Sequence, residues 1–157
     1  MKKTIALLMS CLVLVGLFSA CGAQDSGETT VDLEAFYEQV TGEHELAAME
    51  DLDSALLENN YPGLTGYTFQ QCVAKASMIS AVVSELVMVE CSSADDAAAV
   101  AKILQDRIDT QVDGGAWYPA SIEQWKQAQV VTNGSYVALI ACSDQSASIA
   151  EAFLAQF

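Results

Sequence analysis

The sequence has little positive charge, a single histidine and no apolar run long enough to cross a membrane. Six Lys and Arg residues stand against 21 Asp and Glu, which gives a formal net charge of −15. Binding to a phosphate backbone requires a basic surface, so this balance excludes nucleic acid as the main partner. The longest apolar run covers residues 5–18, which is shorter than the roughly 20 residues that a membrane-spanning helix needs.

The scarcity of histidine limits the chemistry that the chain can perform. His44 lies in an acidic Gly-Glu-His-Glu stretch, and without it neither a Ser-His-Asp nor a Cys-His nucleophile can be assembled. Adjacent residues of a helix point in different directions, so His44, Glu43 and Glu45 are poorly placed to bind one metal ion. We interpret His44 as a solvated surface residue. The sequence therefore predicts no catalytic residues, no metal and no cofactor.

The N-terminus has the layout of a secretory signal. Two lysines precede the apolar run, and small side chains precede Cys21. Residues 17–22 resemble the lipobox of bacterial lipoproteins, although Phe18 replaces the usual Leu. The resemblance implies that residues 1–20 are a signal peptide cleaved just before Cys21, whose thiol carries a diacylglyceryl group. Because two acyl chains anchor a protein stably, we expect attachment to the outer face of the cell membrane.

Removal of the signal would leave a strongly acidic chain with an uneven charge distribution. The net charge becomes −17, and residues 22–74 hold eleven acids and no Lys or Arg. Residues 21–30 are polar and Gly-containing, which predicts a flexible tether. Residues 31–60 form an expected acidic helical arm. Anionic headgroups repel such a chain, so the lipid, and not surface charge, would hold it at the membrane.

Hydrophobic periodicity predicts secondary structure along the rest of the chain. Helices are expected at 31–42, 43–59, 93–112, 118–128 and 144–157, and strands at 72–80, 84–91 and in a hairpin over 130–142. Asn133 and Gly134 indicate a type I′ turn in that hairpin. Residues 69–83 could instead form one buried helix.

The element order predicts an α+β domain over residues 61–157. Two ββα units would form an antiparallel four-stranded sheet with helices on one face, preceded by the two helices of the arm. The sequence leaves open whether the arm docks on this domain.

Three cysteines belong to the expected domain. Cys91 and Cys142 each end an apolar strand before a helix, so a disulfide between them at one end of the sheet is possible. The alternative, which we favour, is that both are buried as small apolar side chains. Cys72 would have no intramolecular partner if the other two were joined.

Short motifs in the second half resemble a known family. They are Ser84-Glu85-Leu86, the segment 106–111, Tyr118-Pro119, Val130-Val131 and the segment 133–137. Together they resemble small lipoproteins of Firmicutes that are catalogued only as a domain of unknown function, over about residues 54–157. The resemblance implies a lipobox, an α+β domain and an extracytoplasmic location, and it implies no activity. The cysteine pair is not part of the family pattern.

Five residues stand out as a candidate binding surface. Glu85 and Arg107 interrupt apolar stretches, and Trp117, Tyr118 and Trp125 flank a Gly-rich connection. These residues could instead have purely structural roles. Glu85 would then be an acid at the edge of the sheet, Arg107 an exposed base on a helix, and the three aromatic residues part of the core or its rim.

The sequence favours a lipid-anchored extracytoplasmic protein. It would act as a non-enzymatic binding or interaction module whose partner is an unidentified envelope protein or ligand. The alternative is a small cell-envelope enzyme, or an enzyme accessory, that uses carboxylates such as Glu85 and Asp96 as acid and base.

Overall fold

The computed structural model describes residues 30–157. The predicted signal peptide, Cys21 and nearly all of the predicted tether therefore lie outside the described residues. The strands are β1 (Glu50–Asp51), β2 (Phe69–Ala76), β3 (Glu85–Cys91), β4 (Gln129–Asn133) and β5 (Tyr136–Ala141). The helices are α1 (Leu33–Glu43), α2 (Ser54–Asn60), α3 (Ala94–Thr110), α4 (Pro119–Trp125) and α5 (Ser146–Leu154). Among the described residues, no helix is both long and apolar enough to cross a membrane.

The fold is α+β, as predicted, around one antiparallel sheet with the strand order β1-β2-β3-β5-β4. The two predicted ββα units are present as β2-β3-α3 and β4-β5-α5. The expectation of four strands is wrong, because β1 adds a fifth at the edge of β2. Glu50 pairs with Ala76 and Asp51 with Lys75.

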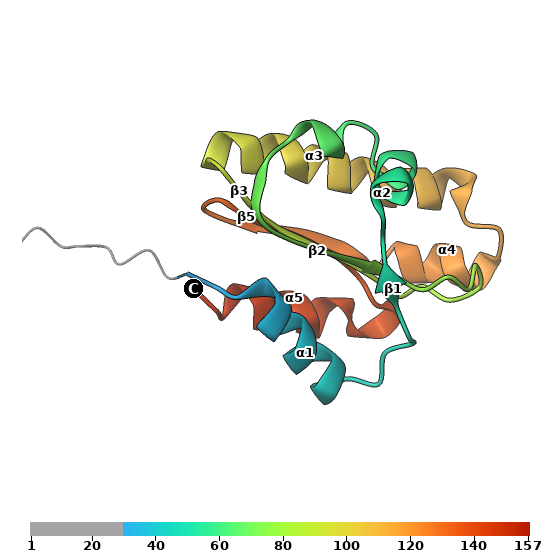
Figure 1. Cartoon of the computed structure of the whole chain (residues 1–157). Coiled ribbons are helices and arrows are strands. Elements are labelled where there is room, and N and C mark those ends of the chain that lie inside the picture. Colours follow the sequence, from blue (N-terminus) through green and yellow to red (C-terminus); the bar gives the residue numbers. More distant parts are fainter. Residues whose placement is uncertain (1–29) are drawn as a thin grey trace, which may run out of the picture.

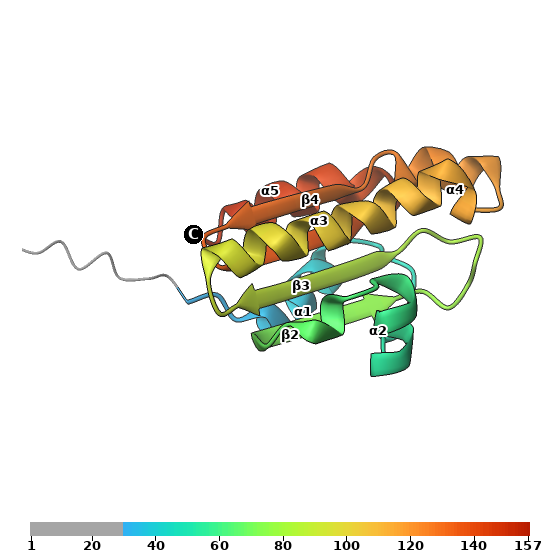
Figure 2. The same cartoon turned by 90° about the horizontal axis from the view of Figure 1, so that it is seen from above.

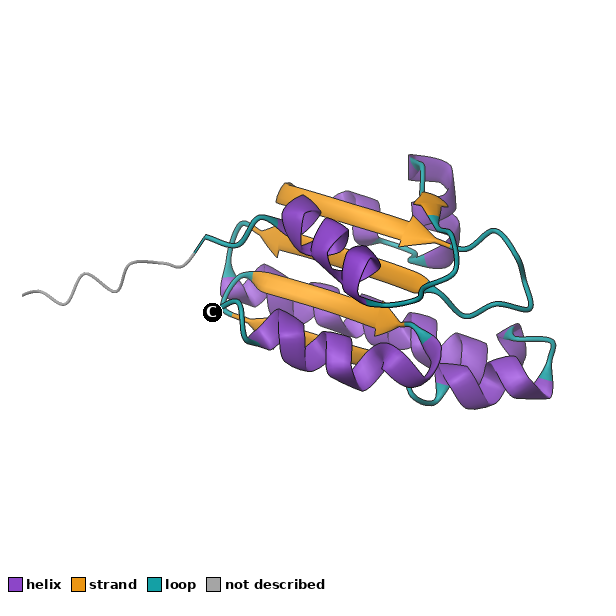
Figure 3. Ribbon diagram, turned by 90° about the horizontal axis from the view of Figure 1, so that it is seen from below, coloured by secondary structure: helices purple, strands orange, loops and turns teal. Residues whose placement is uncertain are grey.

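Helices cover both faces of the sheet, which corrects the prediction of a single covered face. Helices α2 and α3 lie above the sheet, and α1 and α5 lie below it (Figures 1 and 3). The central strands explain this arrangement. Val87 and Val89 of β3 pack toward α3, whereas Leu86 and Met88 pack toward α1 and α5. Side chains alternate across a strand, so a strand that is apolar on both sides needs cover on both.

The acidic N-terminal segment is part of this core, which answers the question of docking. Leu33, Phe36 and Val40 of α1 are buried in the same cluster as Leu86 and Phe153. Phe36 and Phe153 meet edge to face, with ring centroids 5.4 Å apart. Helix α1 therefore packs directly on the lower face of the sheet.

The second predicted helix is much shorter than expected. Only Ser54–Asn60 is helical, because Asp53 caps that helix by accepting hydrogen bonds from the amides of Ala55 and Leu56. The preceding segment is extended so that Glu50–Asp51 can pair with β2. Lys75 holds this edge, with Nζ 2.9 Å from Asp51 Oδ1 and 3.3 Å from Glu34 Oε1.

The structure decides two predictions about local structure, the helix or strand at residues 69–83 and the type of turn between β4 and β5. Residues 69–76 form β2, so the alternative of one buried helix over 69–83 is wrong. The β4–β5 hairpin is confirmed, but its turn consists of Gly134 and Ser135. Only Gly134 has a positive φ, of 56°, so Asn133 does not contribute a left-handed residue and the predicted type I′ assignment is wrong.

The possible disulfide between Cys91 and Cys142 is also wrong. Cys91 is the last residue of β3, whereas Cys142 follows Ala141, which pairs with the first residue of that strand. Six residues of strand separate the two positions, roughly 20 Å, whereas a disulfide requires Cα atoms within about 7 Å. All three described cysteines are free thiols.

Thiol labelling tests this assignment. Cys72 is exposed, whereas burial raises the pKa of Cys91 to about 11 and that of Cys142 to about 12. A thiol reagent without reductant should modify Cys72 in the folded protein, and Cys91 and Cys142 only after unfolding, as read by peptide mass mapping. Resistance of Cys91 and Cys142 to labelling in denaturant would instead indicate a bridge.

Candidate functional site

A buried ion pair joins two of the sequence-predicted residues. Glu85 at the start of β3 is 4% exposed, and Arg107 reaches it from the last turns of α3. Arg107 Nε donates to Glu85 Oε1 at 3.1 Å and Nη2 donates to Oε2 at 3.0 Å. This is the two-pronged geometry in which a guanidinium matches a carboxylate best. Glu85 is therefore neutralised in place, inside the layer between the sheet and α3.

Tyr61 supplies a third hydrogen bond to the same carboxylate. Its hydroxyl donates to Glu85 Oε1 from the residue that follows α2, and Tyr61 itself is 0% exposed. Burial, followed by the negative charge of Glu85, raises the pKa of Tyr61 well above its usual value, so the hydroxyl stays protonated. Burial opposes the charge on Arg107, but the hydrogen bonds and charge of Glu85 outweigh it and raise the Arg107 pKa.

Aromatic rings enclose the guanidinium. Arg107 Cζ lies 5.3 Å from the ring centre of Trp125 in α4 and 5.8 Å from that of Tyr61. Both distances are within the range of cation–π attraction. Glu85, Arg107, Tyr61 and Trp125 form a unit, called here the buried network, which ties the ends of α2, α3, α4 and β3 together. Its polar groups bind one another, so its role is to position these elements.

The carboxylate pair of the enzyme hypothesis is not brought together. Glu85 opens β3, whereas Asp96 lies in the first turn of α3, beyond the other end of that strand. Asp96 is close enough to Cys91 to contribute to the raised pKa of that thiol. These two acids therefore cannot act on one substrate atom.

The two other predicted surface residues are separate from the buried network and point outward. Trp117 is 89% exposed and Tyr118 is 51% exposed, in the connection between α3 and α4. The loop between β2 and β3 exposes Met78 and Ile79, at 50% and 62%. Figures 1 and 2 place both connections at the same end of the molecule. This end, defined by the β2–β3 loop 77–84 and by the segment 111–118 between α3 and α4, is called the distal end.

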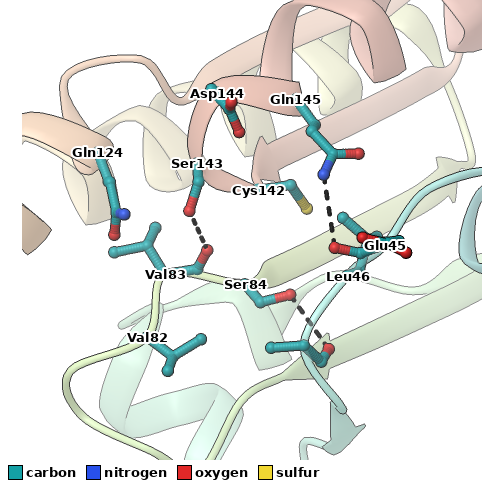
Figure 4. Close-up of a pocket in the computed structure, with 11 residues that line it drawn as sticks. Glu45, Leu46, Val82, Val83, Ser84, Gln124, Cys142, Ser143, Asp144 and Gln145 are labelled. Carbon is teal, nitrogen blue, oxygen red and sulfur yellow. Dashed lines mark hydrogen bonds between the residues drawn. The ribbon is translucent and has the colours of Figure 1, made fainter.

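The distal end also contains a cavity of about 350 Å³. It lies beneath the start of β3 and the end of β5, between the segments 45–47, 82–84 and 142–145 and α4. Figure 4 shows Gln124 on one side and Glu45 on the other, with Ser84 and Cys142 between them. Sequence reasoning missed this cavity because its walls come from four distant segments.

Hydrogen bonds within the walls fix the cavity's shape. Ser143 Oγ donates to the Val83 carbonyl at 3.1 Å, and Ser84 Oγ donates to the Ala47 carbonyl at 3.4 Å. Of residues 30–157, Ser143 is the one non-glycine with a left-handed backbone, at φ 52°. Residues outside glycine adopt this conformation only where the surrounding structure enforces it. The wall is thus held in one arrangement by its own contacts.

His44 buttresses this wall, so the prediction of a solvated surface histidine is wrong. The side chain is half-buried, and its Nδ1 lies 2.7 Å from Gln145 Oε1. An amide oxygen only accepts hydrogen bonds, so the imidazole Nδ1–H is the donor. Within the described part of the chain, no group of three His, Cys, Asp or Glu side chains is placed to hold a metal ion.

Some residues of the buried network could be identified from the sequence. Glu85 and Arg107 were detectable because each interrupts an apolar stretch, but their expected exposure was wrong and their pairing across 22 residues was not predictable from spacing. Trp125 is buried, at 5%, and belongs to the network instead of a surface. Tyr61 gave no signal because it lies in a turn cluster with Pro62.

Removing one partner of the ion pair should destabilise the fold strongly. Arg107→Ala leaves a buried carboxylate unpaired, so we expect the free energy of unfolding in urea to fall by about 3–5 kcal/mol. The double variant Glu85→Leu/Arg107→Met removes both charges and should lose less than Arg107→Ala. The matched control is Lys126→Ala, which breaks an exposed pair with Glu123 and should lose less than about 1 kcal/mol. An Arg107→Ala protein as stable as this control would contradict the assignment.

Comparison with known proteins gives a family and no activity. The family described as "Domain of unknown function (DUF4358)" matches residues 43–142. No curated protein and no solved structure matches the chain. The matched segment runs from the end of α1 to Cys142, and so contains the whole sheet and the buried network. The chain belongs to the DUF4358 family of domains of unknown function.

Proposed function

We propose that this protein is a lipid-anchored, extracytoplasmic binding module that presents its distal end to a partner at the cell envelope. The observation that carries the binding role is the exposure of Trp117, which is 89% accessible. A rigid aromatic side chain buries much apolar surface at little cost in side-chain entropy, and such residues dominate protein interfaces. Tyr118, Met78 and Ile79 provide further exposed apolar surface at the same end.

The positions of the N-terminal end and of Trp117 in the fold support a binding surface that faces away from the membrane. The amide of Val31, near the start of the described residues, donates to the hydroxyl of Tyr136 at 3.3 Å, and Tyr136 is the first residue of β5. The distal end lies beyond the last residue of β5, and α3 has 17 residues, about 25 Å of helix. A lipid on Cys21 would therefore hold the opposite end of the domain, and Trp117 would face away from the membrane.

The charge distribution fits the same proposal. A mature chain with a net charge of −17 is repelled by anionic headgroups. The lipid would retain the protein, and the repulsion would keep the domain in solvent, where its distal end is accessible. The lipobox resemblance at residues 17–22 supports the anchor.

The anchor is tested by Cys21→Ala in the native host. Because the thiol is the acylation site in the proposal, we expect the variant to leave the membrane fraction and to lose the mass of the lipid. Cys72→Ala, which removes a cysteine outside the lipobox, is the control and should remain in the membrane fraction. If Cys21→Ala stays in the membrane with no change in mass relative to the parent, the lipoprotein proposal is wrong.

The binding role is tested by Trp117→Ala/Tyr118→Ala in membranes treated with a cross-linker. Loss of an interface anchor commonly costs about 2 kcal/mol, so the yield of the main cross-linked partner at limiting concentration should fall roughly thirtyfold. The control Leu56→Ala/Leu154→Ala truncates two other exposed apolar residues, at 37% and 43%, and should leave the yield unchanged. Equal loss in both double variants, or none in either, would contradict a distal binding surface.

A further inference from the structure

We infer that Met78 is a site of reversible oxidation, and that its conversion to methionine sulfoxide weakens binding at the distal end. The effect on binding rests on the proposed function, whereas the oxidation is a property of the chain alone. Three features support the inference: the accessibility of the Met78 thioether, the rigidity of the loop that carries it, and the apolar surface to which it belongs.

Met78 is the accessible thioether of residues 30–157. It is 50% exposed, whereas Met88 is 0% exposed in the central strand β3 and Met49 is half-buried. A thioether needs no ionisation to react with an oxidant, so access decides which methionine is modified. The exposed thiol of the same residues is Cys72. Desolvation raises the pKa of Cys72, which keeps this thiol protonated and slow to react, because the thiolate is the nucleophile.

Hydrogen bonds fix the loop that carries Met78. The amide of Ser77 donates to the carbonyl of Ser84 at 2.8 Å and closes the base of the loop. The hydroxyl of Ser121 in α4 donates to the carbonyl of Ala81 at 3.3 Å, and Ser121 is itself buried. The loop is therefore held against the layer beneath it, and Met78 cannot turn into the core. Oxidation of a side chain that lies in solvent leaves the core packing unchanged.

Met78 lies in a neutral and apolar surface. Loop 77–84 contains no charged residue, and Ile79, next to Met78, is 62% exposed. The hydrogen bond from Ser121 ties this loop to α4, which begins two residues after Trp117. Figures 1 and 2 show the two connections side by side. An interface of ordinary size covers about 800 Å² of each partner, so an interface centred on Trp117 includes Met78.

The oxidation is a two-electron reaction with a hydroperoxide such as hydrogen peroxide. A lone pair of the Met78 sulfur attacks one peroxide oxygen, and the O–O bond breaks. The transferred oxygen passes its proton to the departing hydroxide, which leaves as water. The sulfur is oxidised to the sulfoxide and the peroxide is reduced. Sulfoxide reductases reverse the step, since two thiols supply two electrons, form a disulfide and release the oxygen as water.

The sulfoxide changes what the distal end can bury. A thioether is apolar, flexible and polarisable, and it suits an apolar interface. The S=O group is polar and accepts hydrogen bonds from water. Burial of this group against an apolar partner removes that hydration without replacing it, which costs free energy. Oxidation of Met78 therefore favours the unbound protein.

Peptide mass mapping of the full-length protein in peroxide-free, non-ionic detergent tests the site. All samples carry Cys72→Ala, which removes the exposed thiol. Under limiting hydrogen peroxide, Met78 should gain the mass of one oxygen atom about tenfold faster than Met88, because access governs the rate. In denaturant the two methionines should react at the same rate. Equal rates in the folded protein would overturn the assignment of the site.

The effect on binding is read from the yield of the partner that is cross-linked in membranes. Purified protein, oxidised or untreated, is added to membranes from a strain that lacks it, so that the oxidant never meets the partner. Oxidation should lower the yield about fivefold, because an unpaired polar group is costly to bury, and sulfoxide reductases should restore it. Met78→Leu keeps the apolar surface and should retain its yield after peroxide, whereas the matched control Met49→Leu should stay sensitive.

Three results would overturn the effect on binding: an unchanged yield after oxidation, an equal loss in Met78→Leu, or no recovery after reduction. If the untreated protein cross-links no partner, the proposed function is wrong and the effect on binding is wrong with it. Mass mapping still decides in that case whether Met78 is the oxidised residue.

Discussion

The buried carboxylate of Glu85 is the constraint on which the arrangement of this protein depends. Among residues 30–157 it is the one charged side chain in the buried class. Moving an ion out of water costs several kcal/mol even after relaxation, and the loss is offset only when the charge is paired and its oxygens are hydrogen-bonded. Here Arg107 and Tyr61 meet both requirements. The fold must therefore bring α2, α3 and β3 to one point before this residue can be buried.

This requirement also orders the distal end of the domain. Ser84, which lines the cavity, precedes Glu85, and Gln124 precedes Trp125, which packs over Arg107. Two residues of the cavity wall are thus sequence neighbours of the buried network, and the connection that exposes Trp117 lies between Arg107 and Trp125. A substitution in the network would therefore change the position of the binding surface, although the substituted residue does not contact a ligand. The ion pair is best understood as a positioning device for the side of the molecule that we propose to bind.

Local patterns in the sequence predicted the elements well where the signal was local. Ser93 caps α3 through a bond to the Asp96 amide, and the apolar stripe of that helix packs on the sheet as expected. The β4–β5 hairpin was recognisable from the Asn-Gly pair between two apolar strands. The elements that were missed depend on distant partners. β1 has two residues and exists because they pair with Lys75 and Ala76, which no periodicity in so short a segment can indicate.

The same distinction applies to the candidate site. Glu85, Arg107 and Trp125 were identified as unusual, yet the meaning of each required knowing that β3 and β5 are buried on both faces. A charge interrupting a strand that is apolar on both sides must be paired inside the protein, whereas in a half-exposed strand it would face solvent. The cavity is harder still to predict from the sequence, because it forms only when the segments 45–47, 82–84 and 142–145 come together in the folded protein. The expected location and lipid depend on residues 1–29, whereas the proposed partner surface depends on Trp117 and its neighbours at the distal end.

The central claim is that the buried network holds the distal end in place. Hydrogen–deuterium exchange of the full-length protein, compared with Tyr61→Phe, tests it most directly, because this variant removes one hydroxyl and keeps the ion pair. The account predicts faster exchange at residues 82–84 and 119–126, with no change at the β4–β5 turn or in the first turns of α3. Uniform acceleration along the chain, or none at the distal end, would contradict it.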